Sequence, residues 1–78
     1  MGIDKIKQDE IKIGANIRRI RKEQKVGQTE LIRMLNLGGV DMNRETLVKI
    51  EQGTQHIKAT QLRAIRDALK TSYDELLK

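Results

Sequence analysis

The chain has 78 residues, contains neither cysteine nor proline, and has Tyr73 as its single aromatic side chain. This composition excludes a disulfide framework and a thiolate zinc site, and it disfavours β-structure, which is rich in aromatic and β-branched residues. The formal net charge is +5, and charged residues make up 35% of the chain, which suits helices with solvated outer faces.

Residues 1–10 are polar, and we expect a loose N-terminal arm over 1–11, or a helix that frays, before a single domain over 12–78. The arm lacks the apolar segment of a secretory signal. No apolar run in the chain approaches the roughly 18 residues that a membrane-spanning helix needs. We therefore expect a cytoplasmic protein without a membrane partner.

Ile13, Ile17 and Ile20 recur at helical spacing and predict a first helix over 12–24. The stretch 11–27 around it carries six basic side chains and one acidic side chain. A basic segment on a small helical domain indicates a polyanionic partner, although a solvated lysine-rich face gives the same count.

Two further helices are predicted on either side of a glycine-containing link. Leu31 and Leu35 define the inner face of a second helix over 28–36, which the glycines after it end. The third helix follows the N-cap Asn43 and runs to Gln52, and Gly53 ends it. Its inward residues are Leu47 and Ile50.

After the third helix we expect a loop over 55–59 and then a fourth helix capped by Thr60. The inward residues of the fourth helix recur at helical spacing: Leu62, Ile65 and Leu69. Ser72 and Glu75 have the spacing of a capping box for a short last helix, with Leu76 inward. The predicted architecture is all-α, a compact five-helix bundle in which helices two and three form a helix-turn-helix unit.

The outward positions of the third helix carry groups that can read DNA bases. Arg44 and Lys49 can donate hydrogen bonds to guanine O6 and N7, and Glu45 can accept one from cytosine N4. Val48 and Gln52 complete this outward set. The unit therefore has the chemistry of a recognition helix.

Residues 13–77 resemble the lambda-repressor-like, or Cro/XRE-type, helix-turn-helix domain. The resemblance rests on four stretches in this order: IGANIRRIRKEQK, QTEL, TLVKIEQG and LRAIRDALKTSYDEL. It implies a DNA-binding domain that places the helix over 43–52 in the major groove. It also implies that four residues contact bases: Asn43, Arg44, Glu45 and Lys49.

The resemblance assigns further roles by position. Gln28 would open the second helix and contact phosphate. Arg21 would pair with Glu51, close to phosphate. An exposed ion pair adds only about 0–1 kcal/mol of stability, so the role of this pair would be to orient the recognition helix. The loop candidates for phosphate contact are Gln55, His56 and Lys58. The sequence departs from the family pattern at Ile32, where a small residue is usual, in the longer link LNLGGVDM, and in lacking proline near Ile57.

Catalysis is the least supported class of function. The sequence has no Ser/His/Asp arrangement, Gly-rich phosphate loop or metal-ligand spacing, so we expect no enzyme activity, no cofactor and no metal. His56 is a lone histidine in a polar loop, and a solvated side chain accounts for it as readily as a phosphate contact does.

These observations predict a sequence-specific, DNA-binding transcriptional regulator that acts as a repressor. Its partners would be double-stranded DNA and a second copy of the chain, with three candidate interface residues near the C-terminus: Tyr73, Leu76 and Leu77. One alternative is the antitoxin of a toxin–antitoxin pair, which has the same fold and a toxin as protein partner. Another is a protein-interaction module that kept the fold without reading DNA. The net charge of −1 over 28–53 favours this last alternative, whereas the basic first helix does not.

Overall fold

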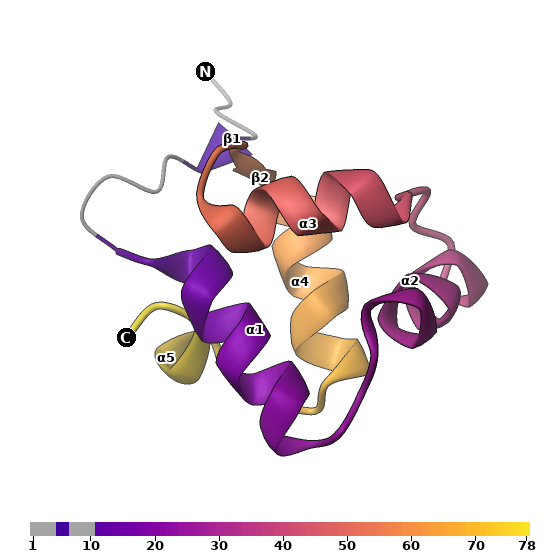
Figure 1. Ribbon diagram of the computed structural model, residues 1–78, viewed down its shortest axis with the longest axis horizontal. Helices are drawn as coiled ribbons and strands as arrows, with labels where there is room; N and C mark the ends of the chain where they lie inside the picture. The colour runs from indigo at the N-terminus through magenta and orange to yellow at the C-terminus, as the bar shows by residue number, and fades with distance from the viewer. Residues whose placement is uncertain (1–4, 7–10) are drawn as a thin grey trace.

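A computed structural model of the chain describes residues 5–6 and 11–78 (Figure 1). It confirms the predicted all-α class, because this part of the chain forms five helices and only two strands of two residues each. In chain order the elements are β1 (Lys5–Ile6), α1 (Ile13–Glu23), α2 (Gln28–Leu37), α3 (Arg44–Gln52), β2 (Ile57–Lys58), α4 (Ala59–Ala68) and α5 (Tyr73–Leu76). None of the described helices has the length and apolar character that crossing a bilayer requires.

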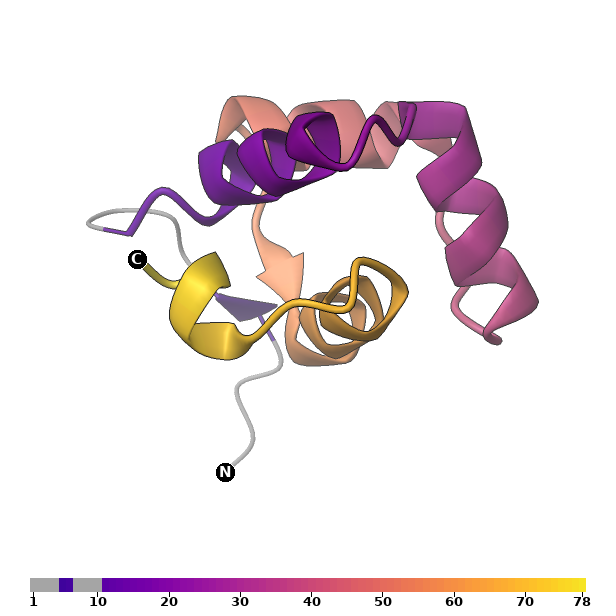
Figure 2. The same ribbon diagram turned by 90° about the horizontal axis from the view of Figure 1, so that it is seen from below.

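The helices form two layers that α2 connects at one end (Figure 2). α1 and α3 lie side by side in one layer, and α4 and α5 lie in the other. α2 begins beside the α1–α3 layer and runs across to α4, with contacts to both α3 and α4. This arrangement brings α1, α3 and the first turn of α2 to the same side of the molecule.

The core is built from aliphatic side chains. All the apolar positions that the sequence placed on inner helix faces are buried, and Ile32 joins them at 9% exposure, although a smaller residue is usual there in the family that the chain resembles. The buried apolar set is Ile13, Ile17, Ile20, Leu31, Ile32, Leu35, Met42, Leu47, Ile50, Ile57, Leu62, Ile65, Leu69 and Leu76. Leu76 is 0% exposed, so it belongs to the core and the expectation that it forms part of a dimer interface is wrong.

Local hydrogen bonds fix the helix ends that the sequence predicted. Asn43 Oδ1 accepts from the backbone N–H of Thr46 at 2.8 Å, which caps α3. Ser72 Oγ accepts from the backbone N–H of Glu75 at 3.2 Å, which caps α5. Gly53 ends α3 in the left-handed conformation, with φ 79°.

Two other helices end on a left-handed lysine. Lys25 follows α1 with φ 60°, and Lys70 follows α4 with φ 51°. At the second site, the backbone N–H of Thr71 returns to the carbonyl oxygen of Arg66 at 3.0 Å, which is the long hydrogen bond of a Schellman motif. This position usually takes glycine, because a side chain is strained there.

The predicted start of the fourth helix is wrong. α4 begins at Ala59, because Gln61 Oε1 accepts from the backbone N–H of Lys58 at 2.8 Å and so satisfies a group at the helix entrance. Thr60 therefore lies inside the first turn. The expected loop over 55–59 is also shorter, because β2 occupies part of it.

β2 has a partner that the sequence did not predict. It pairs antiparallel with β1, and Ile6 lies opposite Ile57. β1 falls within the arm expected over 1–11. The rest of that arm, apart from Ile11, lies outside the described residues, at positions 1–4 and 7–10.

Gly14 sets the distance between α1 and α3. It is buried in the first turn of α1, and a Cβ added there would overlap the carbonyl oxygen of Ile50 and lie 2.9 Å from the Cα of Glu51. Only a residue without a side chain permits this approach. The backbone of α3 therefore lies directly against that of α1.

Candidate nucleic-acid interface

Arg21 of α1 and Glu51 of α3 form an ion pair through two hydrogen bonds. Arg21 Nε donates to Glu51 Oε2 at 2.8 Å, and Nη2 donates to Oε1 at 2.9 Å. The side chains are only 8% and 2% exposed, so the pair is buried and the expectation of an exposed pair is wrong. The hydrogen bond to Glu51 raises the pKa of Arg21, against the effect of burial. Arg21 Nη1 also donates to the carbonyl oxygen of Val26 at 2.9 Å, which fixes the segment that enters α2.

The ion pair continues through two further side chains. Gln28 Nε2 donates to Glu51 Oε1 at 3.1 Å, and Arg44 Nε donates to Gln28 Oε1 at 3.3 Å. Arg21, Glu51, Gln28 and Arg44 thus form one hydrogen-bonded series, which we call the polar chain. It joins α1, the first residue of α2 and both ends of α3. The expected Arg21–Glu51 pair is therefore present, and it is linked to Gln28 and Arg44, which the sequence singled out separately.

A hollow of about 390 Å³ lies beside the polar chain, and we call it the basic hollow. Four cationic side chains line it: Arg18, Arg21, Lys22 and Arg44. The start of α2 completes the lining, and its N-cap Gly27 has no side chain to accept from the first-turn N–H groups. Unpaired N–H groups at a helix start, surrounded by cations, make a site suited to phosphate or another oxyanion.

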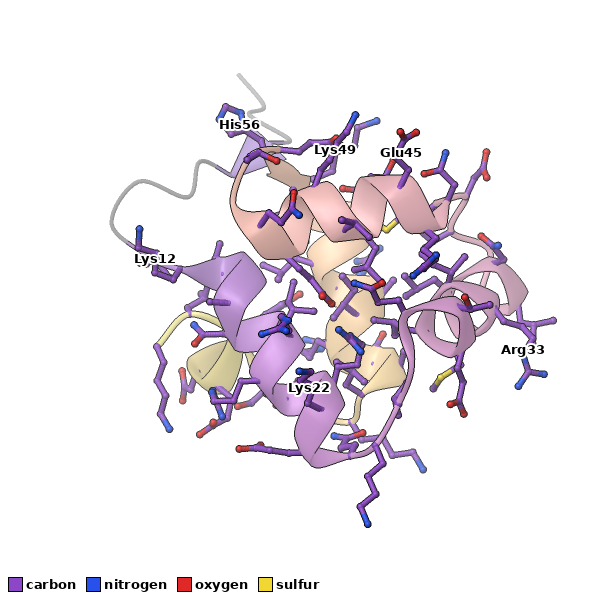
Figure 3. The ribbon with its side chains drawn as sticks, viewed as in Figure 1. Lys12, Lys22, Arg33, Glu45, Lys49 and His56 are labelled. Carbon is purple, nitrogen blue, oxygen red and sulfur yellow. The ribbon has the colours of Figure 1, made fainter. Side chains whose placement is uncertain are left out.

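The outer face of α3 adjoins the basic hollow through Arg44. Arg44, Glu45 and Lys49 are all exposed, on the side away from the buried Leu47 and Ile50. Figure 3 shows the side chains of Glu45 and Lys49 projecting from α3 toward the same edge of the molecule.

A second hollow, of about 360 Å³, lies where the chain leaves α3, and we call it the loop hollow. The three loop residues proposed for phosphate contact, Gln55, His56 and Lys58, all line it. Thr54 and Gln61 complete the lining. His56 points to the same edge of the molecule as Lys49 (Figure 3). The candidate site residues are therefore distributed over the basic hollow, the outer face of α3 and the loop hollow.

Sequence reasoning missed two residues of this surface. Arg18 and Lys22 line the basic hollow with Arg21, and they lie three residues before and one residue after it. Residues at i, i+3 and i+4 share one helix face, so this spacing was the signal that could have identified them. Among the described residues, no group of three or more His, Cys, Asp or Glu side chains could hold a metal ion.

Comparisons with known proteins support the architecture. No family model matches the sequence, and no curated protein matches it. Among solved structures, the chain is similar to the restriction-modification controller protein C.AhdI from Aeromonas hydrophila, with a TM-score of 0.71 and 23% identity over 85% of this chain and 92% of that one. It is also similar to a point mutant of the restriction-modification controller protein C.Esp1396I, with a TM-score of 0.70 and 23% identity over 83% and 81% of the two chains. These similarities show that the helical fold is shared.

Proposed function

We propose that this chain is a sequence-specific regulator of transcription that binds double-stranded DNA and inserts α3 into the major groove. The observation that supports the proposal is the basic hollow, which lies at the start of α2 next to Arg44, the first residue of α3, and has the lining expected of an oxyanion site. A backbone phosphate in this hollow would hold the duplex in register while the outer face of α3 reads base edges.

The base-reading residues in this proposal are Asn43, Arg44, Glu45 and Lys49. Arg44 uses Nε to donate to Gln28, and its remaining guanidinium N–H groups would donate to guanine or phosphate. Glu45 would accept from a cytosine amino group. Asn43 uses Oδ1 to cap α3, so its side-chain N–H₂ group is the part that would donate to a base.

The phosphate contacts would come from both hollows. Arg18, Lys22 and Gln28 serve the basic hollow, and the loop hollow contributes Gln55, His56 and Lys58. Arg21 takes mainly a positioning role, because three of its five N–H groups are already engaged by Glu51 and Val26.

A homodimer is the assembly that we propose on DNA, since one such domain reads only a few base pairs. Tyr73 and Leu77 at α5 remain 38% and 37% exposed. Ile11, next to α1, is 39% exposed, and α1 contacts α5. These three partly exposed side chains are the candidates for contact with the second copy. Two copies on a near-palindromic operator would block transcription, and the controller proteins with the same fold make a regulatory role the leading choice.

The test is selection of bound duplexes from a random DNA pool at about 100 mM salt, a screening length of roughly 10 Å. We expect an enriched near-palindrome. Arg44→Glu should abolish the enrichment, whereas the matched reversal Arg33→Glu, on the exposed side of α2 away from α3, should preserve it (Figure 3). Absence of any enriched motif for the unaltered chain, or equal loss in both variants, would overturn the proposal.

The same variants separate the two alternatives. A protein-interaction module would bind its partner equally well with Arg44→Glu and would show no DNA motif. An antitoxin would give the motif and would also co-purify with a toxin, so co-purification distinguishes it from a regulator that acts without a protein partner.

A further inference from the structure

Val48 is an apolar side chain on the otherwise polar outer surface of α3. It is half-buried, whereas its neighbours Glu45, Lys49 and Gln52 are exposed. Four half-buried apolar residues of the described chain pack against the core, namely Val26, Val40, Ala64 and Ala68, whereas Val48 and Met34 are half-buried outside that set. Packing against that core therefore does not account for the partial burial of Val48.

Helix geometry places Val48 in the middle of the candidate DNA-contacting face. It lies four residues after Arg44 and three after Glu45, so the three side chains are neighbours on one face. Arg44 marks the side of this face that adjoins the basic hollow. A duplex held by that hollow with α3 in its major groove would meet Val48 together with Arg44 and Glu45.

Neither helix formation nor packing explains a valine at this position. A β-branched residue lowers helix propensity relative to the long polar residues around it. An apolar side chain that stays partly exposed on the outer surface also gains less from burial than a core residue does. An apolar side chain at this position would be favoured by a ligand that presents an apolar group in the middle of an otherwise polar surface.

We infer that Val48 is a specificity-determining residue that contacts the 5-methyl group of thymine in the major groove. Among the base edges exposed there, only thymine presents an apolar group, and the other three bases offer hydrogen-bond donors and acceptors. The inference rests on the proposed function of α3 and adds to it the identity of one base that the helix would contact.

The experiment uses the duplex selected by the unaltered protein and a series in which one thymine per half-site is replaced by uracil, which lacks only the methyl group. We expect one position at which uracil weakens binding about fourfold per half-site, the equivalent of burying one methyl group. Val48→Ala should bind the thymine duplex about fourfold more weakly per subunit and lose nothing further with uracil at that position. Alanine raises helix propensity, so this loss does not reflect unfolding.

Val40→Ala is the matched control, because it makes the same change at a half-buried valine that packs against the core between α2 and α3. It should keep the affinity and the full uracil effect of the unaltered protein. If Val48→Ala keeps the uracil effect at every thymine, or if uracil has no effect on the unaltered protein, the inference is wrong while the proposed function stands. Failure to select any motif would overturn both.

Discussion

Glu51 at the end of α3 receives two hydrogen bonds from the guanidinium group of Arg21 on α1, and both side chains are buried. A buried pair of this kind adds little net stability, because the cost of removing two charges from water offsets their attraction. It does fix geometry, since the two hydrogen bonds permit only one relative orientation of the groups. The pair thereby holds α3 in place without giving the fold much of its stability.

Replacing one member of this ion pair should lower the free energy of unfolding much more than replacing both members. We expect Glu51→Leu to lower the free energy of unfolding by about 3–5 kcal/mol, because the Arg21 charge stays buried without its partner. Combining it with Arg21→Met should restore most of that loss. Urea denaturation measures both variants, and a double variant as unstable as the single one would contradict this account. The double variant should bind DNA more weakly than the unaltered protein even when its stability is restored, because Gln28 then loses the carboxylate that orients it.

Replacing Gly14 by alanine should destabilise the fold, because the new methyl group would overlap the backbone of α3. A backbone oxygen in a helix cannot move aside as a side chain can, so we expect a loss of about 2 kcal/mol or more. For a domain of this size that corresponds to a Tm lower by roughly 10 °C. Gly38→Ala is the control, since its nearest contact would be an ordinary 3.5 Å. An unchanged Tm for Gly14→Ala would mean that α1 and α3 can separate freely.

Lys70→Gly should stabilise the protein by about 0.5 kcal/mol. The left-handed conformation after α4 costs a side-chain-bearing residue about 1–2 kcal/mol, and the greater freedom of glycine in the unfolded chain offsets part of the gain. Lys70→Ala retains a Cβ and should give no such gain. Thermal or urea unfolding distinguishes the two variants, and equal stability for both would show that the backbone conformation is not the cause.

DNA binding should fall steeply with salt. If about four phosphates are neutralised per subunit, the slope of log K against log salt is near −3.6 per subunit. Lys22→Ala removes one cation of the basic hollow and should make this slope shallower by about 0.9. Fluorescence anisotropy with the selected duplex measures the slope. A slope near zero would contradict the proposed phosphate contacts, and an unchanged slope for Lys22→Ala would remove this residue from them.

The dimer should depend on α5. Leu77→Asp places a charge among the proposed contact residues and should raise the dimer dissociation constant at least tenfold, which is about 1.4 kcal/mol. Leu37→Asp is the control, because Leu37 is 80% exposed at the end of α2, remote from α5 in the sequence and in the fold. Sedimentation velocity measures both. If Leu37→Asp dissociates the dimer and Leu77→Asp does not, the interface lies at α2 instead.

Sequence patterns predicted the helices well, because their inner faces repeat at helical spacing and several of their ends rest on local hydrogen bonds. The caps Asn43 and Ser72 show this, since each accepts from an N–H three residues ahead. The predicted start of α4 was wrong because Thr60 and Gln61 are both polar side chains that can satisfy a backbone group where the helix begins. Gln61 accepts from the entrance N–H, and nothing in the local sequence ranks it above Thr60.

The parts that sequence could not supply depend on contacts between distant residues. The pairing of β1 with β2 joins segments about fifty positions apart and involves only two residues on each side. Gly14 is unremarkable in the sequence, because the need for glycine arises from the backbone of α3. The polar chain likewise links Gln28 to Glu51 and Arg44 only after three helices have docked. The base and phosphate contacts themselves stay predictions.

The close crossing at Gly14 also bears on how such a protein could acquire a new binding sequence. With the backbones of α1 and α3 in contact and the Arg21–Glu51 pair beside them, a mutation that tilts α3 has to disrupt the interior first. The exposed side chains of α3 can change without disturbing this packing, so substitutions there would be tolerated more readily than a change in the tilt of the helix. In this scaffold, a change of DNA target would occur by substitution of a few exposed side chains on α3, while the angle at which α3 packs on α1 would stay the same.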